Sequence, residues 1–120
     1  MNRGAKGGRI ERRAKKMLEA KGYTVIKSGG SLGLFDLVAW NTVMIRFIQV
    51  KSGRPPGPLE RQRLKEAVAT IPKCGVVETW TFRDGDPKHP ETVFYDPKGV
   101  YRIKMDVDEL EIFLAKGAWK

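Results

Sequence analysis

Cysteine and histidine are almost absent from this chain of 120 residues. Cys74 and His89 each stand alone, which excludes an internal disulfide, a cysteine-based zinc site and a histidine cluster around a metal. His89 lies in a polar segment and is expected to be a loop residue, not a catalytic base. Any metal must therefore be held by oxygen ligands, which favours magnesium or manganese.

Long apolar runs are also absent. No stretch approaches the roughly 18 apolar residues that a transmembrane helix needs, and no apolar segment follows the basic residues at the N-terminus. We therefore expect a cytoplasmic protein without a membrane partner. The length corresponds to one domain with a substantial core.

Acidic residues are scarce in the first two thirds of the chain. The net charge is +7 over residues 1–27, +4 over residues 28–77 and −2 over residues 78–120. A basic surface attracts a polyanion such as DNA through counterion release, with a strong dependence on salt. The alternatives are a basic surface that only favours solubility and one that binds anionic lipid.

The N-terminal segment is rich in glycine. Residues 1–8 contain three glycines and two cations, Arg3 and Lys6, without hydrophobic periodicity. They are predicted to form a flexible basic arm. Residues 9–120 are predicted to form the single folded domain.

A first helix is predicted over residues 9–20, ending before Gly22. Glu11 falls at the edge of the apolar stripe of this helix, so its side chain is aimed toward the body of the protein. An acid that interacts with the helix dipole is the alternative for Glu11. The apolar stripe consists of Ile10, Ala14, Met17 and Leu18.

The remaining segments alternate between strand and helix patterns. Strands are predicted at residues 23–27, 35–40, 43–51, 75–82, 92–95 and 100–103, and helices at residues 58–70 and from residue 106, where a capping box begins. This order predicts an α/β sandwich around a mixed sheet.

The strands at residues 35–40 and 43–51 are predicted to form a hairpin. A two-residue turn would pair Asp36 with Phe47, and would place Asp36 on the same face as Gln49 and Lys51. Ionisable groups on otherwise apolar strands are costly unless they have a partner or a chemical role. The alternative is that these residues only keep the strand ends soluble.

Two loops could approach a phosphate. The glycine-rich segment at residues 28–33 would let backbone amides come close, and Ser31 could donate a hydrogen bond, although an ordinary tight turn explains the glycines equally well. The segment at residues 52–58 is a proline-rich loop that carries Arg54.

Four segments together resemble a known family. They are Ile10-Glu11-Arg12-Arg13, residues 22–31, residues 35–39 and Ile48-Gln49-Val50-Lys51. In this combination they are similar to the archaeal-type Holliday junction resolvases of the PD-(D/E)XK nuclease superfamily, over residues 4–52. The resemblance implies a restriction-endonuclease-like fold, in which helices flank a mixed β-sheet.

The resemblance also implies roles for individual residues. Ser31 would lie near the scissile phosphate, and Lys51 would orient the attacking water and stabilise charge on the phosphate. The implied metal-ligating positions are Glu11, Asp36, Gln49 and Val50, with Asp36 as the main ligand. Gln49 replaces the usual glutamate of the family, so one formal charge is missing and metal affinity should fall.

Arg12 and Lys27 match positions that contact DNA in the family, and the other expected DNA-binding residues are Arg3, Lys6, Arg9 and Arg54. The family acts as a twofold homodimer, because a four-way junction offers two equivalent strands to cut. Apolar residues late in the chain would belong either to this interface or to the core: Val76, Trp80, Phe82, Phe94 and Phe113.

The resulting hypothesis is a structure-selective endonuclease that resolves four-way (Holliday) DNA junctions with Mg²⁺ or Mn²⁺. One alternative is a nuclease of the same fold that acts on another branched or duplex DNA, since loops and dimer geometry decide the substrate. The other is a DNA-binding module whose site has decayed, which Gln49 suggests.

Overall fold

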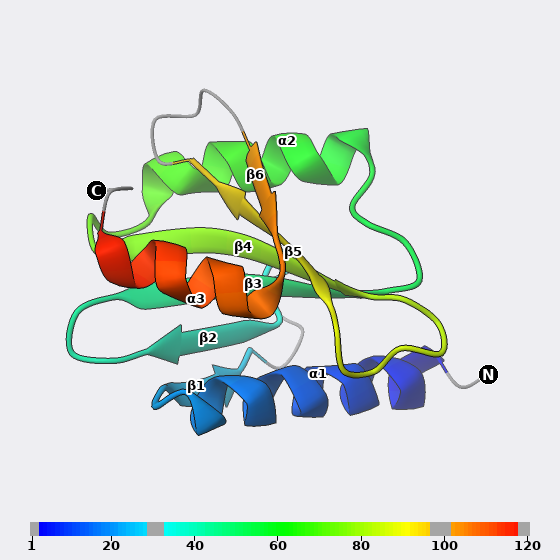
Figure 1. The fold of residues 1–120 in the computed structure, drawn as a ribbon. Helices are drawn as coiled ribbons and strands as arrows, with labels where there is room; N and C mark the ends of the chain where they lie inside the picture. Colours follow the sequence, from blue (N-terminus) through cyan, green and yellow to red (C-terminus); the bar gives the residue numbers. More distant parts are fainter. Residues whose placement is uncertain (1–2, 29–32, 97–101, 118–120) are drawn as a thin grey trace.

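A computed structural model of the protein describes residues 3–28, 33–96 and 102–117. It contains a six-stranded sheet with helices on both faces (Figure 1). In chain order the elements are α1 (Arg3–Ala20), β1 (Thr24–Lys27), β2 (Leu37–Trp40), β3 (Ile45–Ser52), α2 (Pro58–Ala67), the short 3₁₀ helix η1 (Val68–Thr70), β4 (Gly75–Phe82), β5 (Glu91–Tyr95), β6 (Arg102–Met105) and α3 (Val107–Lys116). The predicted order of elements is confirmed.

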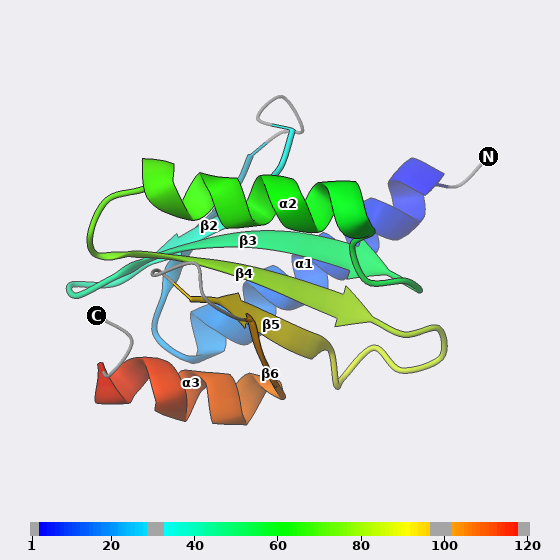
Figure 2. The same cartoon turned by 90° about the horizontal axis from the view of Figure 1, so that it is seen from above.

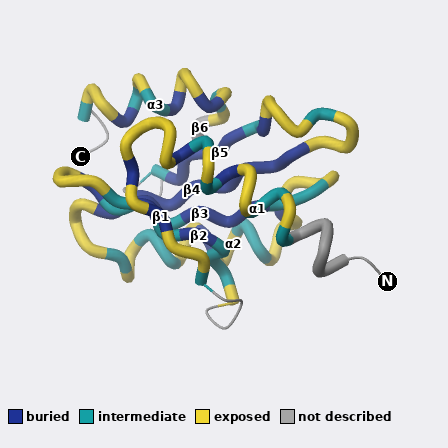
Figure 3. The backbone as a smooth tube through the Cα atoms, turned by 90° about the horizontal axis from the view of Figure 1, so that it is seen from below, coloured by how far each residue is buried: buried dark blue, intermediate teal, exposed yellow. Residues whose placement is uncertain are grey.

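The strands lie in the sheet in the same order as in the chain, from β1 to β6. Strands β3 and β4 run parallel, and the other neighbouring strands pair antiparallel, so the predicted mixed sheet is confirmed. A parallel pair needs a crossover connection, which α2 provides. Every residue of β4 is buried, and the tube in Figure 3 is darkest along the middle of the sheet.

Two hydrophobic cores hold the layers together. Helices α1 and α3 cover one face of the sheet through Ala14, Leu18, Leu110 and Leu114. Leu64 of α2 packs on the opposite face against Val77 and Tyr95. Figures 1 and 2 show α1 and α2 on opposite sides of β3.

The apolar residues that were candidates for an interface belong to the core. Val76, Trp80, Phe82 and Phe94 are at most 2 % exposed, and Phe113 packs against them, with its ring 5.0 Å from that of Phe94. Burial of such large side chains favours folding by roughly 1.5–3 kcal/mol each. The four strand residues are therefore not available to a partner subunit without unfolding, and Phe113 is only partly exposed.

Helix α1 begins earlier than predicted. It starts at Arg3, six residues before the predicted start, so residues 3–8 are helical where a segment without regular structure was expected. Glycines 4, 7 and 8 each cost a helix about 1 kcal/mol relative to alanine, which is why the sequence favoured a later start. Adding turns to an existing helix is easier than starting one, and the packed turns after Ile10 supply that start. Whether the first turns detach as an arm stays a prediction.

The hairpin register also differs from the prediction. Trp40 pairs with Ile45 and Val38 with Phe47, so the predicted pairing of Asp36 with Phe47 is wrong. The cause is the Asn41 side chain, whose Oδ1 accepts hydrogen bonds from the amides of Val43 (2.9 Å) and Met44 (3.0 Å) and widens the turn to four residues. Because the shift is by two residues, every side chain keeps its predicted face.

The predicted C-terminal end of α1 and the predicted N-terminal end of α3 are confirmed. Gly22 follows α1 with φ of 95°. Asp106 and Glu109 form the capping box of α3, each side chain accepting from the other residue's backbone amide. Among the described residues, no helix has the length and apolarity needed to cross a membrane.

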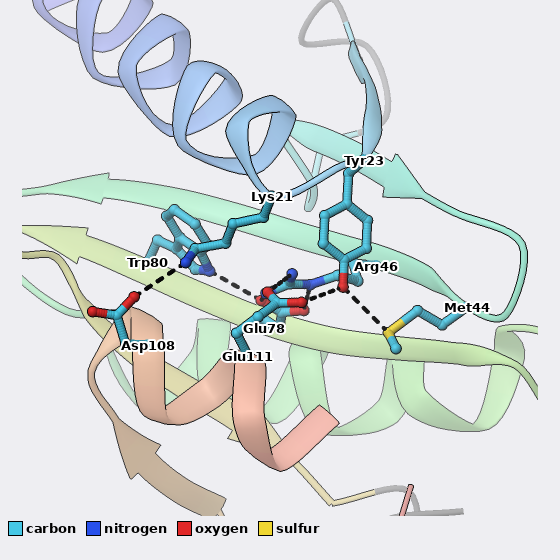
Figure 4. A network of polar contacts seen from close by, with 8 residues as sticks. All are labelled: Lys21, Tyr23, Met44, Arg46, Glu78, Trp80, Asp108 and Glu111. Atoms are coloured by element: carbon cyan, nitrogen blue, oxygen red, sulfur yellow. Dashed lines mark hydrogen bonds and ion pairs between the residues drawn. The ribbon is translucent and has the colours of Figure 1, made fainter. Parts of the chain in front are cut away.

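Charged side chains lie inside the core between the sheet and α3. Arg46 and Glu78 are fully buried and form an ion pair, which Glu111 of α3 joins from the edge (Figure 4). The Tyr23 hydroxyl donates to Glu111 (2.7 Å), and the Trp80 indole donates to Glu78 (3.0 Å). The guanidinium of Arg46 also lies 4.8 Å from the Tyr23 ring centroid. This network connects α3 to the middle of the sheet.

Candidate active site

Asp36 is held by the main chain at the start of β2. Its amide donates to the carbonyl of Ile48 (2.9 Å), and the amide of Ser28 donates to its carbonyl (2.9 Å). Its carboxylate accepts a hydrogen bond from the amide of Val50 (2.8 Å). The register that pairs Leu37 with Ile48 brings Asp36 level with Gln49 on the neighbouring strand.

Gln49 and Lys51 follow on the same face of β3, and both reach the first turn of α2. The Gln49 amide donates from Nε2 to Oε2 of Glu60 (3.3 Å), and Lys51 Nζ lies 3.1 Å from Oε1 of the same carboxylate. The structure thus brings Asp36, Gln49 and Lys51 together, as predicted, and adds Glu60.

Glu60 was missed because it lies outside the segments that resemble the nuclease family. The sequence does carry a signal for it. A helix that begins at Pro58 shortly after β3 must start near the carboxyl end of that strand, and Glu60 is the acidic residue in its first turn. An acid there lies close to the side chains at the end of β3, which are those of Gln49 and Lys51.

Both predicted acids have a raised pKa. Burial raises the pKa of Asp36, the Val50 amide and Lys51 oppose this shift, and the charge of Glu60 adds to it. Burial also raises the pKa of Glu11, as does the charge of Asp36, whereas Lys27 opposes the shift from 3.7 Å away. A carboxylate whose pKa is raised by burial and by a neighbouring negative charge lies where a cation is favourable.

Cations line the outer surface of α1. Arg9 and Arg12, with Arg13 and Lys16, border a shallow groove of about 260 Å³. Two of the predicted DNA-binding residues, Arg9 and Arg12, are exposed there, and a third, Arg54, is exposed in the loop after β3. Lys27 is instead paired with Glu11. Ser31 lies outside the described residues, as do residues 29–32 of the glycine-rich turn and the side chains of Arg3 and Lys6.

No family model matches the chain, and no curated protein matches it. A solved structure is similar: that of Hjc, a Holliday junction resolvase from the archaeal hyperthermophile Archaeoglobus fulgidus. The TM-score is 0.56 at 18 % sequence identity, over 83 % of this chain and 86 % of that one. This chain has the fold of an archaeal Holliday junction resolvase.

The likeness to Hjc confirms the predicted resemblance at the level of the fold. It also confirms the restriction-endonuclease-like architecture, with a mixed sheet between helices. The chemical roles of individual residues depend on the geometry around Asp36.

The donor set in this Hjc-like fold suits a hard divalent cation. Asp36 and Glu60 supply carboxylate oxygens, and Gln49 supplies an amide oxygen. Oε1 of Gln49 is buried and has no hydrogen-bond partner among the described residues, and the same holds for Oγ1 of Thr79, which pairs with Gln49 across β3 and β4. A buried acceptor without a partner is costly, and a bound cation would satisfy it. Among the described residues, no three Asp, Glu, His or Cys side chains are grouped closely enough to hold a metal by themselves.

Proposed function

We propose that this protein is a structure-selective endonuclease that resolves four-way DNA junctions by metal-dependent phosphodiester hydrolysis. The observation that carries the proposal is that the Lys51 ammonium lies near enough to the Asp36 carboxylate to oppose the rise in its pKa, at the end of β3 and within the fold of an archaeal resolvase. A carboxylate and an amine at one strand end are the groups that this chemistry needs.

Each residue of the candidate site would have a separate chemical role. A bound Mg²⁺ or Mn²⁺ would polarise the phosphate and lower the pKa of an attacking water. Asp36, with Gln49 beside it, would hold the ion, and the Val50 amide fixes the rotamer of the Asp36 carboxylate. The Lys51 ammonium would orient the water and stabilise the charge that develops on the phosphate.

The remaining residues would bind and position DNA. Arg9 and Arg12 in the groove on α1 would contact phosphates beside the cut, with Arg54 reaching from the loop after β3. Ser31 would lie at the scissile phosphate, and Glu11 near the metal. We further propose a homodimer, because a junction offers two equivalent strands and a twofold pair of sites matches them.

A cleavage assay tests the proposal directly. Wild-type protein should cut a labelled four-way junction in Mg²⁺, cut a linear duplex much less, and cut neither in EDTA. Asp36→Asn should abolish cutting and still bind the junction, because affinity comes mainly from phosphate contacts. Asp108→Asn removes an exposed carboxylate on α3 and should cut normally.

Two results would redirect the proposal. Equal cutting of junction and linear duplex would favour a nuclease of this fold with another substrate. Junction binding without cutting, at any metal concentration, would favour the decayed DNA-binding module that the neutral Gln49 suggests.

A further inference from the structure

The neutral side chain at position 49 leaves the site short of negative charge. Gln49 is 5 % exposed, and its Oε1 has no partner among the described residues. Asp36 carries one negative charge, and the Lys51 ammonium nearby opposes the binding of any cation. Hard divalent ions favour charged oxygen ligands, so Asp36 and a neutral amide would bind such an ion weakly.

A second carboxylate lies at the same place but comes from another element. Because α2 is the crossover between the parallel strands β3 and β4, its first turn sits beside the carboxyl end of β3. From there Glu60 contacts both Gln49 and Lys51, at 3.3 and 3.1 Å. Its charge also acts on Asp36. The Glu60 side chain is 39 % exposed, so an ion from solvent can reach it.

We propose that Glu60 supplies the carboxylate that position 49 lacks, so that the metal is held between the β2–β3 hairpin and the first turn of α2. This inference rests on the proposed metal-dependent function and adds a ligand to the same site. Glu60 now contacts the Gln49 amide and the Lys51 ammonium, and a bound cation would replace these contacts. The cation would also reduce the repulsion between the carboxylates of Asp36 and Glu60.

A different role for Glu60 is purely structural. An acid in the first turn of a helix interacts favourably with the helix dipole, and here it also pairs with Lys51. Such an exposed pair contributes at most about 1 kcal/mol to folding. Under this role, metal binding would not depend on Glu60 except through Lys51.

Metal binding without DNA separates these roles. Mn²⁺ binding to wild type, Glu60→Gln and Glu66→Gln is measured by electron paramagnetic resonance, and thermal melting in EDTA verifies that each variant is folded. Glu66 lies on the same helix, is exposed, and contacts Gln62. Glu60→Gln should weaken Mn²⁺ binding by about tenfold or more, a typical cost of disturbing a metal site. Glu66→Gln should leave binding unchanged.

Two further variants make the test specific. Gln49→Glu combined with Glu60→Gln moves the carboxylate back to the strand, and should restore Mn²⁺ affinity to near the wild-type value. In a Lys51→Met background, Glu60→Gln should still weaken Mn²⁺ binding. Loss of the Glu60 effect in that background would show that Glu60 acts only by positioning Lys51, and would overturn the inference.

The inference and the proposed function fail in distinguishable ways. If wild type binds Mn²⁺ and cuts junctions, but Glu60→Gln binds Mn²⁺ equally well, the inference is wrong and the function stands. If wild type binds no Mn²⁺ and cuts nothing, the proposed function fails and the inference fails with it. If Glu60→Gln weakens Mn²⁺ binding but wild type cuts no junction, the metal site stands and the junction substrate does not.

Discussion

Arg46 binds both carboxylate oxygens of Glu78 inside the protein. Its Nε lies 2.6 Å from Oε2 and its Nη2 lies 2.8 Å from Oε1, and both side chains are completely buried. The remaining guanidinium nitrogen, Nη1, donates to Glu111 at 2.8 Å. Since burying two charges is expensive, the pair is tolerable only because these hydrogen bonds satisfy it.

Breaking this pair should strongly destabilise the protein. Glu78→Gln leaves the Arg46 charge buried beside a neutral amide, so we expect a loss of about 3–5 kcal/mol in the free energy of unfolding. Urea denaturation measures it. Glu19→Gln removes one partner of the exposed Lys15–Glu19 pair and should cost less than about 1 kcal/mol. Equal losses for the two variants would contradict this account of the network.

Asp36→Asn should stabilise the metal-free protein at neutral pH. Burial raises the pKa of Asp36 above its unfolded value, so this carboxyl favours the folded state most at low pH, and that contribution is lost as the pH rises through the folded pKa. Asparagine carries no charge and can still accept the Val50 hydrogen bond. In EDTA the variant should melt at a higher temperature than wild type at pH 7, and the difference should shrink as the solution is acidified toward pH 4.

Two controls accompany this measurement. Asp108→Asn, on the surface of α3, should show no comparable gain at pH 7. Adding Mn²⁺ at pH 7 should raise the melting temperature of wild type more than that of Asp36→Asn, because a ligand that binds the folded state stabilises it. A lower melting temperature for Asp36→Asn in EDTA at pH 7 would show that its carboxylate serves mainly as a structural hydrogen-bond acceptor.

Deleting residues 1–8 should weaken DNA binding without unfolding the domain, because the buried stripe of α1 starts beyond this segment. The deletion removes Arg3 and Lys6. Each phosphate contact contributes roughly 0.9 to the slope of log K against log salt on duplex DNA, so the slope should flatten by up to about 1.8. The double variant Arg3→Gln, Lys6→Gln should give the same flattening if charge is responsible. An unchanged slope in both would mean that these residues do not touch DNA.

Most of the fold could be predicted from local sequence patterns. The apolar stripe of α1, the alternation in β2 and β3, and the capping box of α3 each depend on residues close in sequence, and each gave the correct element and face. The hairpin register was missed because the Asn41 side chain, not strand propensity, sets the turn. The start of α1 was predicted too late because three glycines disfavour a helix over residues 3–8. There the helix continues from the packed turns that follow it.

The parts that depend on distant contacts could not be predicted. Arg46 and Glu78 lie on different strands and only meet because β3 and β4 are neighbours. Asp36, Gln49 and Lys51 were placed together because one hairpin contains them. Glu60 is different, because its place in the first turn of the helix that follows β3 is visible in the sequence. The sequence also did not show which apolar side chains belong to the core. The burial of Trp80, for example, depends on the assembled sheet.

The chain-order arrangement of the strands has a consequence for local opening. The edge strands β1 and β6 can separate from the sheet without breaking the ladder between β3 and β4. Hydrogen exchange should therefore be fastest at the edges and slowest along β3 and β4, where opening approaches global unfolding. The end of β3 that carries Gln49 and Lys51 belongs to the slowest-exchanging part, so this side of the candidate site should stay in place while the edge strands open.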